Sequence, residues 1–254
     1  MRVVRFLYHK DQYYGVYEKD TITSIHGDPF DGIALTDQKF SYDEVKLLAP
    51  VMPGKIIAAG LNYISHAREL KMELPKEPLV FLKPSSSVLD PFDAIIRPVQ
   101  SSRVDYEAEL AVVIGKKCKN VSPEEAGGYV LGFTCLNDVT ARDLQAKESQ
   151  WTRAKGFDTF CPIGPWVETQ YDWRNKRIRA ILNGELKQDA NTDDFIHPVE
   201  KLISYISAVM TLNPGDVVAT GTASGIGPMS AGDTIQIEIE GIGILQNTVA
   251  DQQV

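Results

Sequence analysis

Short apolar runs separated by polar breaks extend along most of the chain, and many have the length and alternation of β-strands. Strands are predicted at residues 2–9, 13–18, 21–27, 52–63, 78–84, 104–117, 129–138, 216–222, 233–241 and 243–249. Residues 177–186 predict a β-hairpin, because Asn183-Gly184 stands between two apolar runs. We therefore expect β-structure to dominate the fold.

Helical periodicity is confined to a few segments. Residues 197–212 give the clearest case, because apolar residues recur at helical spacing from Val199 to Ile206. Ser122 and Glu125 have the spacing of a capping box, which marks a helix start. Shorter helical segments are predicted at residues 41–50, 65–73 and 140–150. Strands do not alternate regularly with helices, so a β-rich α+β fold is predicted rather than a doubly wound parallel sheet.

The pattern divides the chain into two parts. Three short predicted strands and a predicted helix that ends at Pro50 make residues 1–50 a small N-terminal domain. Residues 51–254 then form one larger domain, and the total length of 254 residues fits this division.

Composition excludes several classes of protein. Apolar residues make up 43% of the chain, enough for a sizeable core, and the net charge of −8 disfavours nucleic acid and anionic membranes as partners. Three cysteines without a CxxC pair disfavour a disulfide framework or a structural zinc site. The pattern shows neither a signal peptide nor a long apolar span, so a cytoplasmic location is expected.

Two carboxylates interrupt the apolar segment VDYEAEL, residues 104–110. In a strand, Glu107 and Glu109 would share one face, with α-carbons roughly 6.6 Å apart. Asp138 ends another predicted strand and could add a third oxygen ligand. Such a set suits a hard cation, Mg²⁺, Mn²⁺ or Ca²⁺, better than zinc. The alternative is that both glutamates lie on the solvent face of an amphipathic strand, and the spacing alone leaves both interpretations open.

Six segments that occur in order resemble the shorter members of the fumarylacetoacetate hydrolase superfamily. They are GLNYISHARE (60–69), FLKPSSS (81–87), DYEAELAVVIG (105–115), NDVTARDLQ (137–145), WTRAKGFDTFCPIGPW (151–166) and TGTASGIG (220–227). The resemblance implies a mixed β-roll catalytic domain after a small N-terminal domain, in a homodimer. It also implies that Glu107, Glu109 and Asp138 bind Mg²⁺ or Mn²⁺, with Ca²⁺ as a possible substitute.

The resemblance assigns further roles to polar residues. Lys155 matches a lysine that faces the substrate near the metal, and Arg142 and Gln145 match residues that contact its oxo-acid end. Thr222 and Tyr63 are assigned to the substrate pocket. The alternative for Arg142 is a surface salt bridge.

His66 and Glu69 match a pair that activates a water in hydrolytic members, and their spacing allows contact on one helical face. The alternative is an ordinary exposed helix pair. Lys83 is expected to hold a loop rather than to take part in chemistry. Residues 65–78 are predicted to form a lid that orders when substrate binds.

Together these assignments predict a metal-dependent hydrolase that cleaves a C–C bond of an acylpyruvate or another β-diketo acid. The predicted path uses a metal-stabilised enolate and a water activated by His66 and Glu69. The same site could instead serve an oxaloacetate decarboxylase or a 2-hydroxyhepta-2,4-diene-1,7-dioate isomerase. A relative that binds an oxo acid without turnover is the alternative of a different class.

Overall fold

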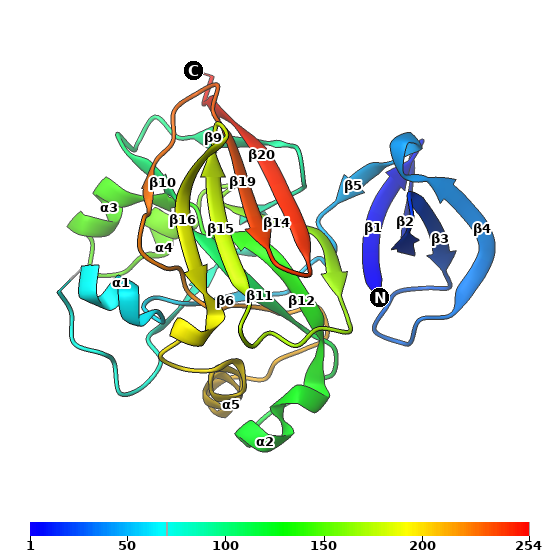
Figure 1. Ribbon diagram of the computed structural model, residues 1–254, viewed down its shortest axis with the longest axis horizontal. Coiled ribbons are helices and arrows are strands. Elements are labelled where there is room, and N and C mark those ends of the chain that lie inside the picture. The colour runs from blue at the N-terminus through cyan, green and yellow to red at the C-terminus, as the bar shows by residue number, and fades with distance from the viewer. Residues whose placement is uncertain (70, 254) are drawn as a thin grey trace.

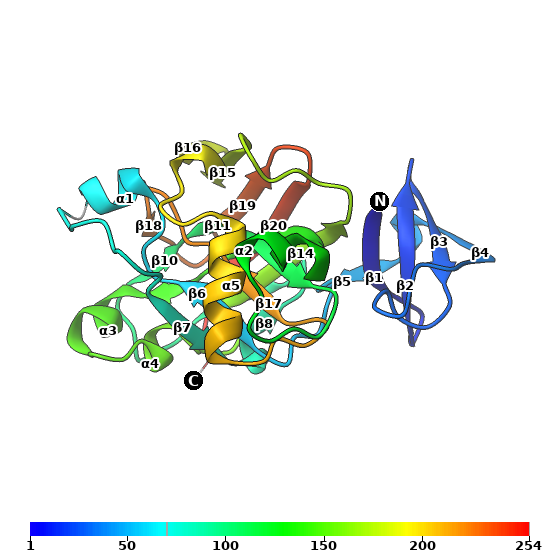
Figure 2. The same cartoon turned by 90° about the horizontal axis from the view of Figure 1, so that it is seen from below.

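The computed structural model describes residues 1–69 and 71–253. The first strands, β1 to β5, form a lobe at one end of the molecule, and the remaining strands and the α-helices form the larger body (Figures 1 and 2). The predicted helix 65–73 and the predicted larger domain include Leu70 and Val254 respectively, which lie outside the described residues.

Strands make up most of the regular structure. The strands are β1 (Arg2–Tyr8), β2 (Asp11–Glu18), β3 (Thr21–Ile25), β4 (Leu35–Ser41), β5 (Lys46–Leu48), β6 (Ile56–Ala59), β7 (Val80–Lys83), β8 (Val88–Leu89), β9 (Ala94–Arg97), β10 (Val104–Tyr106), β11 (Ala108–Ile114), β12 (Val130–Asn137), β13 (Thr140–Ala141), β14 (Cys161–Glu168), β15 (Arg177–Leu182), β16 (Glu185–Asn191), β17 (Val217–Ala219), β18 (Gly227–Pro228), β19 (Thr234–Ile239) and β20 (Gly243–Asp251). The α-helices are α1 (Ile64–Glu69), α2 (Pro123–Ala126), α3 (Arg142–Lys147), α4 (Thr152–Lys155) and α5 (Val199–Val209).

One large sheet runs through both parts of the molecule in the order β4-β3-β2-β1-β14-β12-β11-β17-β6-β7. The two parts meet where β1 pairs with β14, with Arg2 opposite Glu168 and Val3 opposite Val167. A second sheet has the order β16-β15-β19-β20-β9, and a small third sheet joins β13, β10 and β18. Most pairs are antiparallel, but β17 lies parallel to β6 and β20 parallel to β9. The predicted β-rich α+β fold with mixed sheets is therefore confirmed.

Strand β11 lies at the centre of the core, and all seven of its residues are buried. Leu110 and Val112 belong to one apolar cluster, with Ile237 of the second sheet. Ala111 and Val113 belong to a second cluster on the other side of the strand. Because both faces of β11 are covered, the interpretation that its glutamate lies on a solvent-exposed face is wrong.

Several local predictions can be compared directly. Helix α5, the capping box at Ser122 and the hairpin turn at Asn183-Gly184 are confirmed, the turn residues having φ of 52° and 81°. The helix predicted at residues 41–50 is wrong. A 3₁₀ turn is followed there by β5, because pairing with β1 places Leu47 in the aromatic core of the small lobe. In the described part of the chain, no helix has both the length and the apolar character needed to cross a bilayer.

Candidate active site

The segment that carries the two glutamates is not a continuous strand. Strand β10 ends at Tyr106 and β11 begins at Ala108, with Glu107 between them. Side chains bind the backbone at this break: the Glu107 N–H donates to Asn137 Oδ1 at 2.9 Å, and the Ala108 N–H donates to Gln188 Oε1 at 2.9 Å. The break therefore has a fixed geometry that the strand ladder alone would not supply.

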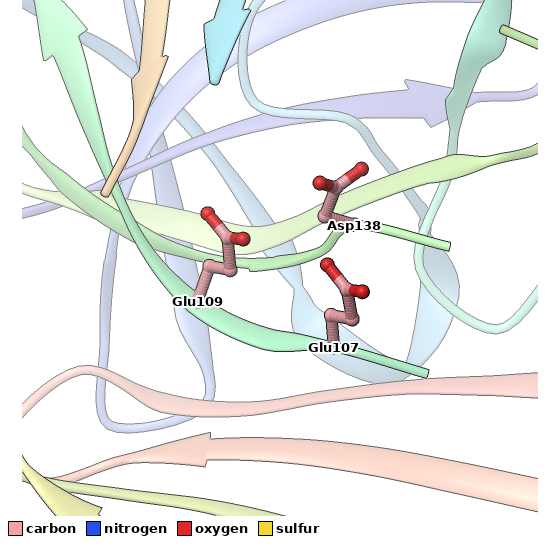
Figure 3. A group of neighbouring side chains, drawn as sticks. All are labelled: Glu107, Glu109 and Asp138. Carbon is pink, nitrogen blue, oxygen red and sulfur yellow. The ribbon is translucent and has the colours of Figure 1, made fainter. Parts of the chain in front are cut away.

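Three carboxylates meet at this break. Glu107, Glu109 and Asp138 are 5%, 1% and 1% exposed, and one oxygen from each lies within 4.8 Å of the others. Asp138 directly follows β12 and reaches the pair from the neighbouring ribbon (Figure 3). The structure thus brings together the three residues that the sequence indicated as cation ligands.

Basic side chains alternate with acidic ones along the site to form a continuous chain of ion pairs. Lys155 Nζ lies 2.8 Å from Glu107 Oε2 and 2.6 Å from Asp138 Oδ2, and Arg142 pairs with both Glu107 and Asp105. The chain of ion pairs runs in the order Arg103, Asp105, Arg142, Glu107, Lys155, Asp138 and Lys83.

Glu109 stands outside this chain of ion pairs. In the described part of the protein, its carboxylate is hydrogen bonded to the Gly221 N–H, at 2.8 Å, and has no cationic partner within ion-pair distance. Burial, together with the charges of Asp138 and Glu107, raises the pKa of Glu109 well above its usual value. Burial acts in the same direction on Glu107, but Lys155 and Arg142 outweigh it and lower the pKa of Glu107 to about 2.

The donor set fits a divalent cation. A buried carboxylate is costly without a positive partner, and Glu109 lacks one among the described residues. Three carboxylate oxygens close together, without histidine or cysteine, are the ligands that Mg²⁺, Mn²⁺ and Ca²⁺ prefer.

A cavity of about 310 Å³ opens beside the triad. Polar and apolar residues both line it. The polar lining residues are His66, Glu107, Glu109, Arg142, Gln145, Lys155 and Thr222. The apolar lining residues include Leu61, Met72, Leu79, Ala146, Trp151 and Ile226.

The predicted pairs of polar residues are in contact. His66 Nδ1 lies 2.9 Å from Glu69 Oε2, and His66 lines the cavity while Glu69 is not among the lining residues. Arg142 donates to Gln145 Oε1 at 2.6 Å from the first turn of α3. The alternative of a surface salt bridge for Arg142 does not describe its position, because its partners Asp105 and Glu107 are buried.

Two residues predicted to contact the substrate, Thr222 and Tyr63, also make contacts within the protein. The Thr222 hydroxyl donates to the Ala108 carbonyl and accepts from Gln188, both at 2.9 Å, so it supports the backbone between the glutamates. Tyr63 is 0% exposed, packs edge-on against Phe195 and does not belong to the cavity lining.

Sequence reasoning missed Asn137 and Gln188. Gln188 lies on β16, 80 residues from the backbone it binds, and nothing in its local sequence indicates this contact. Asn137 directly precedes the predicted ligand Asp138, which was the one available signal.

Two protein-family models match the chain. "Fumarylacetoacetate (FAA) hydrolase C-terminal" matches residues 55–250, and "Rv2993c-like, N-terminal" matches residues 1–50. The chain belongs to the fumarylacetoacetate hydrolase family.

Individual relatives cover most of the chain. An uncharacterised protein of Methanocaldococcus jannaschii is 56% identical over 203 residues, which are 80% of this chain and 86% of that protein. Human mitochondrial oxaloacetate tautomerase FAHD2A is 43% identical over 219 residues, 81% of this chain and 70% of that protein.

Solved structures agree along the whole length. A 5-carboxymethyl-2-hydroxymuconate delta-isomerase from Mycobacterium smegmatis has a TM-score of 0.94 at 40% identity, covering 99% of this chain and all of that one. A maleylpyruvate hydrolase from Sphingobium sp. SYK-6, in complex with manganese(II) and pyruvate, has a TM-score of 0.84 at 33% identity, and each chain covers all of the other.

Proposed function

We propose that this protein is a divalent-metal-dependent hydrolase that cleaves a C–C bond of acylpyruvates. The observation that carries the proposal is the His66–Glu69 pair, of which His66 lines the same cavity as Glu107 and Glu109. A base and a cation site facing one small cavity suit the attack of water on a carbonyl group.

The cation is the first part of the proposal. Glu107, Glu109 and Asp138 would hold Mn²⁺ or Mg²⁺, with Ca²⁺ as a possible substitute, and the manganese complex of the Sphingobium hydrolase supports Mn²⁺. When bound, the cation supplies a Lewis acid for the oxo group of the substrate.

The protein's own residues would divide the remaining work. With Nδ1–H donated to Glu69, His66 presents Nε2 to the cavity as the base that takes a proton from water. The water would attack the acyl carbonyl, and the bond from that carbon to the neighbouring carbon would break. The proton taken from water would then go to the carbon of the pyruvate enolate, so that a carboxylic acid and pyruvate result. Lys155 and Arg142 place positive charge where the pyruvate half gains negative charge.

The apolar lining residues support an acyl group rather than a second carboxylate. Among the described lining residues, the permanent cations are Arg142 and Lys155, and both are paired with carboxylates. Leu61, Leu79 and Ile226 have no group that could pair with a distal charge, so a short acyl chain fits these residues better than a dicarboxylate.

Turnover of acetylpyruvate tests the proposal. Purified protein is assayed by loss of the diketo absorbance, first with added Mn²⁺ or Mg²⁺ and then after chelation. The expected result is release of acetate and pyruvate that stops with chelation and returns with Mn²⁺. Full activity after chelation would exclude the metal-dependent mechanism, and no turnover with any acylpyruvate would exclude the reaction.

A second candidate is proton transfer without water attack. The name of the human relative, oxaloacetate tautomerase, supports a proton-transfer reaction. The name of the structure from Mycobacterium smegmatis, a delta-isomerase, supports it as well. The same cation and Lys155 would stabilise the enolate of oxaloacetate, while His66 takes the proton from the enol oxygen and returns one to the neighbouring carbon. Measuring enol-to-keto conversion of oxaloacetate beside acetylpyruvate hydrolysis decides which activity dominates.

A further inference from the structure

Lys83 lies beneath the triad, at the end of β7, and is 1% exposed. Its Nζ donates to Asp138 Oδ1 at 2.6 Å and to the carbonyl of Lys155 at 2.6 Å, with a longer contact of 3.4 Å to the carbonyl of Val139. Three acceptors therefore surround the three protons of one ammonium group. Lys83 does not line the cavity, so a bound substrate would not touch it.

Asp138 is held by two lysines of different kinds. Lys83 donates to Oδ1 and does not line the cavity, while Lys155 donates to Oδ2 at 2.6 Å and lines it. Lys155 shares its ammonium between Asp138 and Glu107, at 2.6 and 2.8 Å, and both carboxylates belong to the triad that would hold a cation.

The two lysines cannot have the same function when a cation is bound at the triad. A cation bound by Glu107 and Asp138 would repel the Lys155 ammonium and turn it toward the substrate. Asp138 would then keep Lys83 as its cationic partner within the protein. The second bond of Lys83, to the Lys155 carbonyl, fixes the backbone from which the Lys155 side chain turns.

We propose that Lys83 is a positioning residue for the cation site. Its ammonium is the permanent partner of Asp138, orients that carboxylate toward the cation, and leaves Lys155 available to the substrate. This inference rests on the proposed cation site, but not on the reaction proposed for it.

Metal affinity measured in the absence of substrate tests the inference. The variants are Lys83→Met, Lys155→Met and, as a control, Lys46→Met, whose lysine pairs with Asp93 on the surface. The dissociation constant of Mn²⁺ is measured by titration calorimetry, with thermal unfolding in a chelator as a separate readout. A purely structural lysine would lower the unfolding temperature without changing the Mn²⁺ affinity of the folded protein.

Lys83→Met is expected to weaken Mn²⁺ binding by about 10- to 100-fold, the usual effect of removing a group that orients a metal ligand. Lys155→Met is expected to bind Mn²⁺ at least as tightly as the wild type, because a competing positive charge is gone. Wild-type affinity in Lys83→Met, or tighter binding in both variants, would overturn the inference.

Folding and function are separated by two further comparisons. If Lys83→Met does not fold, the double variant Lys83→Met/Asp138→Asn is expected to fold, because both buried charges are removed together. A double variant that stays unfolded would contradict the pairing. Wild-type protein that binds Mn²⁺ without turning over acylpyruvates would reject only the proposed reaction, while wild-type protein that binds no divalent cation would reject both.

Discussion

The backbone N–H of Ala108 is hydrogen bonded to the side-chain oxygen of Gln188 at 2.9 Å, although the two residues lie 80 positions apart in the sequence. Gln188 also donates to Thr222 Oγ1 and to the Ala223 carbonyl, at 2.9 and 2.8 Å. One buried amide of the second sheet therefore fixes the backbone between the two glutamates.

Replacing Gln188 with Ala should destabilise the protein and disturb the cation site together. Each buried backbone group left without a partner costs about 1–3 kcal/mol, so we expect a loss of at least that size in the free energy of unfolding. Urea unfolding in chelator measures it, and Gln170→Ala, at an exposed position, is the control. An unchanged unfolding midpoint would show that water replaces the amide.

Replacing Glu109 with Gln should abolish Mn²⁺ binding. The change keeps the size of the side chain and removes the one triad charge that has no cationic partner among the described residues. Titration calorimetry with Mn²⁺ measures the loss, and Glu44→Gln, at an exposed position, should bind like the wild type. Retained binding in Glu109→Gln would remove this residue from the ligand set.

The same variant predicts a change in pH dependence without metal. Burial and the neighbouring charges of Asp138 and Glu107 raise the pKa of Glu109 above its usual value of 4.5, so the folded state holds this proton more tightly than the unfolded state. Stability is therefore lost as the pH rises from 4.5 through the folded pKa, and the loss persists above it. In chelator, between about pH 5 and 8, the unfolding temperature of the wild type should fall more steeply than that of Glu109→Gln. Parallel profiles would contradict the predicted shift.

His66→Ala separates hydrolysis from the other candidate reactions. Loss of a positioned base should reduce acetylpyruvate hydrolysis by about 10²–10⁴-fold, while Mn²⁺ affinity stays unchanged because His66 is not part of the triad. Glu69→Gln should give a smaller loss, since Glu69 acts through His66. Equal losses of hydrolysis and of oxaloacetate decarboxylation in His66→Ala would show that the role of His66 is not specific to water attack.

A charge placed at an apolar position of the cavity lining should change the preferred substrate. Leu79→Arg introduces a cation into the lining, and a hydrogen bond to a charged group contributes about 1.5–3 kcal/mol. The ratio of kcat/KM for maleylpyruvate over acetylpyruvate should therefore rise about tenfold or more. Leu79→Met serves as the uncharged control, and the same ratio in both variants would place the distal end of the substrate elsewhere.

The sequence predicted the helices, turns and site residues that local sequence patterns determine. Helix α5 and the hairpin turn at Asn183 follow from periodicity and turn chemistry, and Asp138 was found because it ends a strand. The break at Glu107 was missed, because it depends on Asn137 and Gln188, whose side chains bind backbone groups from other strands.

The contact of Lys83 with Asp138 is another that local sequence patterns did not predict. It was expected to hold a loop, and its FLKP context gives no sign of Asp138, 55 residues further along the chain. Contacts between distant strands are set by sheet order, which local periodicity does not specify. The residue types of the site could therefore be read from the sequence, whereas the groups that orient them could not.

The pairing of β1 with β14 has a consequence for any shortened form of the protein. A chain without residues 1–50 would leave the backbone of β14 near Val167 unpaired, and it would uncover Trp166, which stacks on Tyr17 at 5.1 Å. A bare strand edge beside an exposed indole ring is a template for joining other chains. The small lobe thus covers the edge of β14 in the sheet that carries the site. A protein that consists of residues 51–254 alone should therefore aggregate.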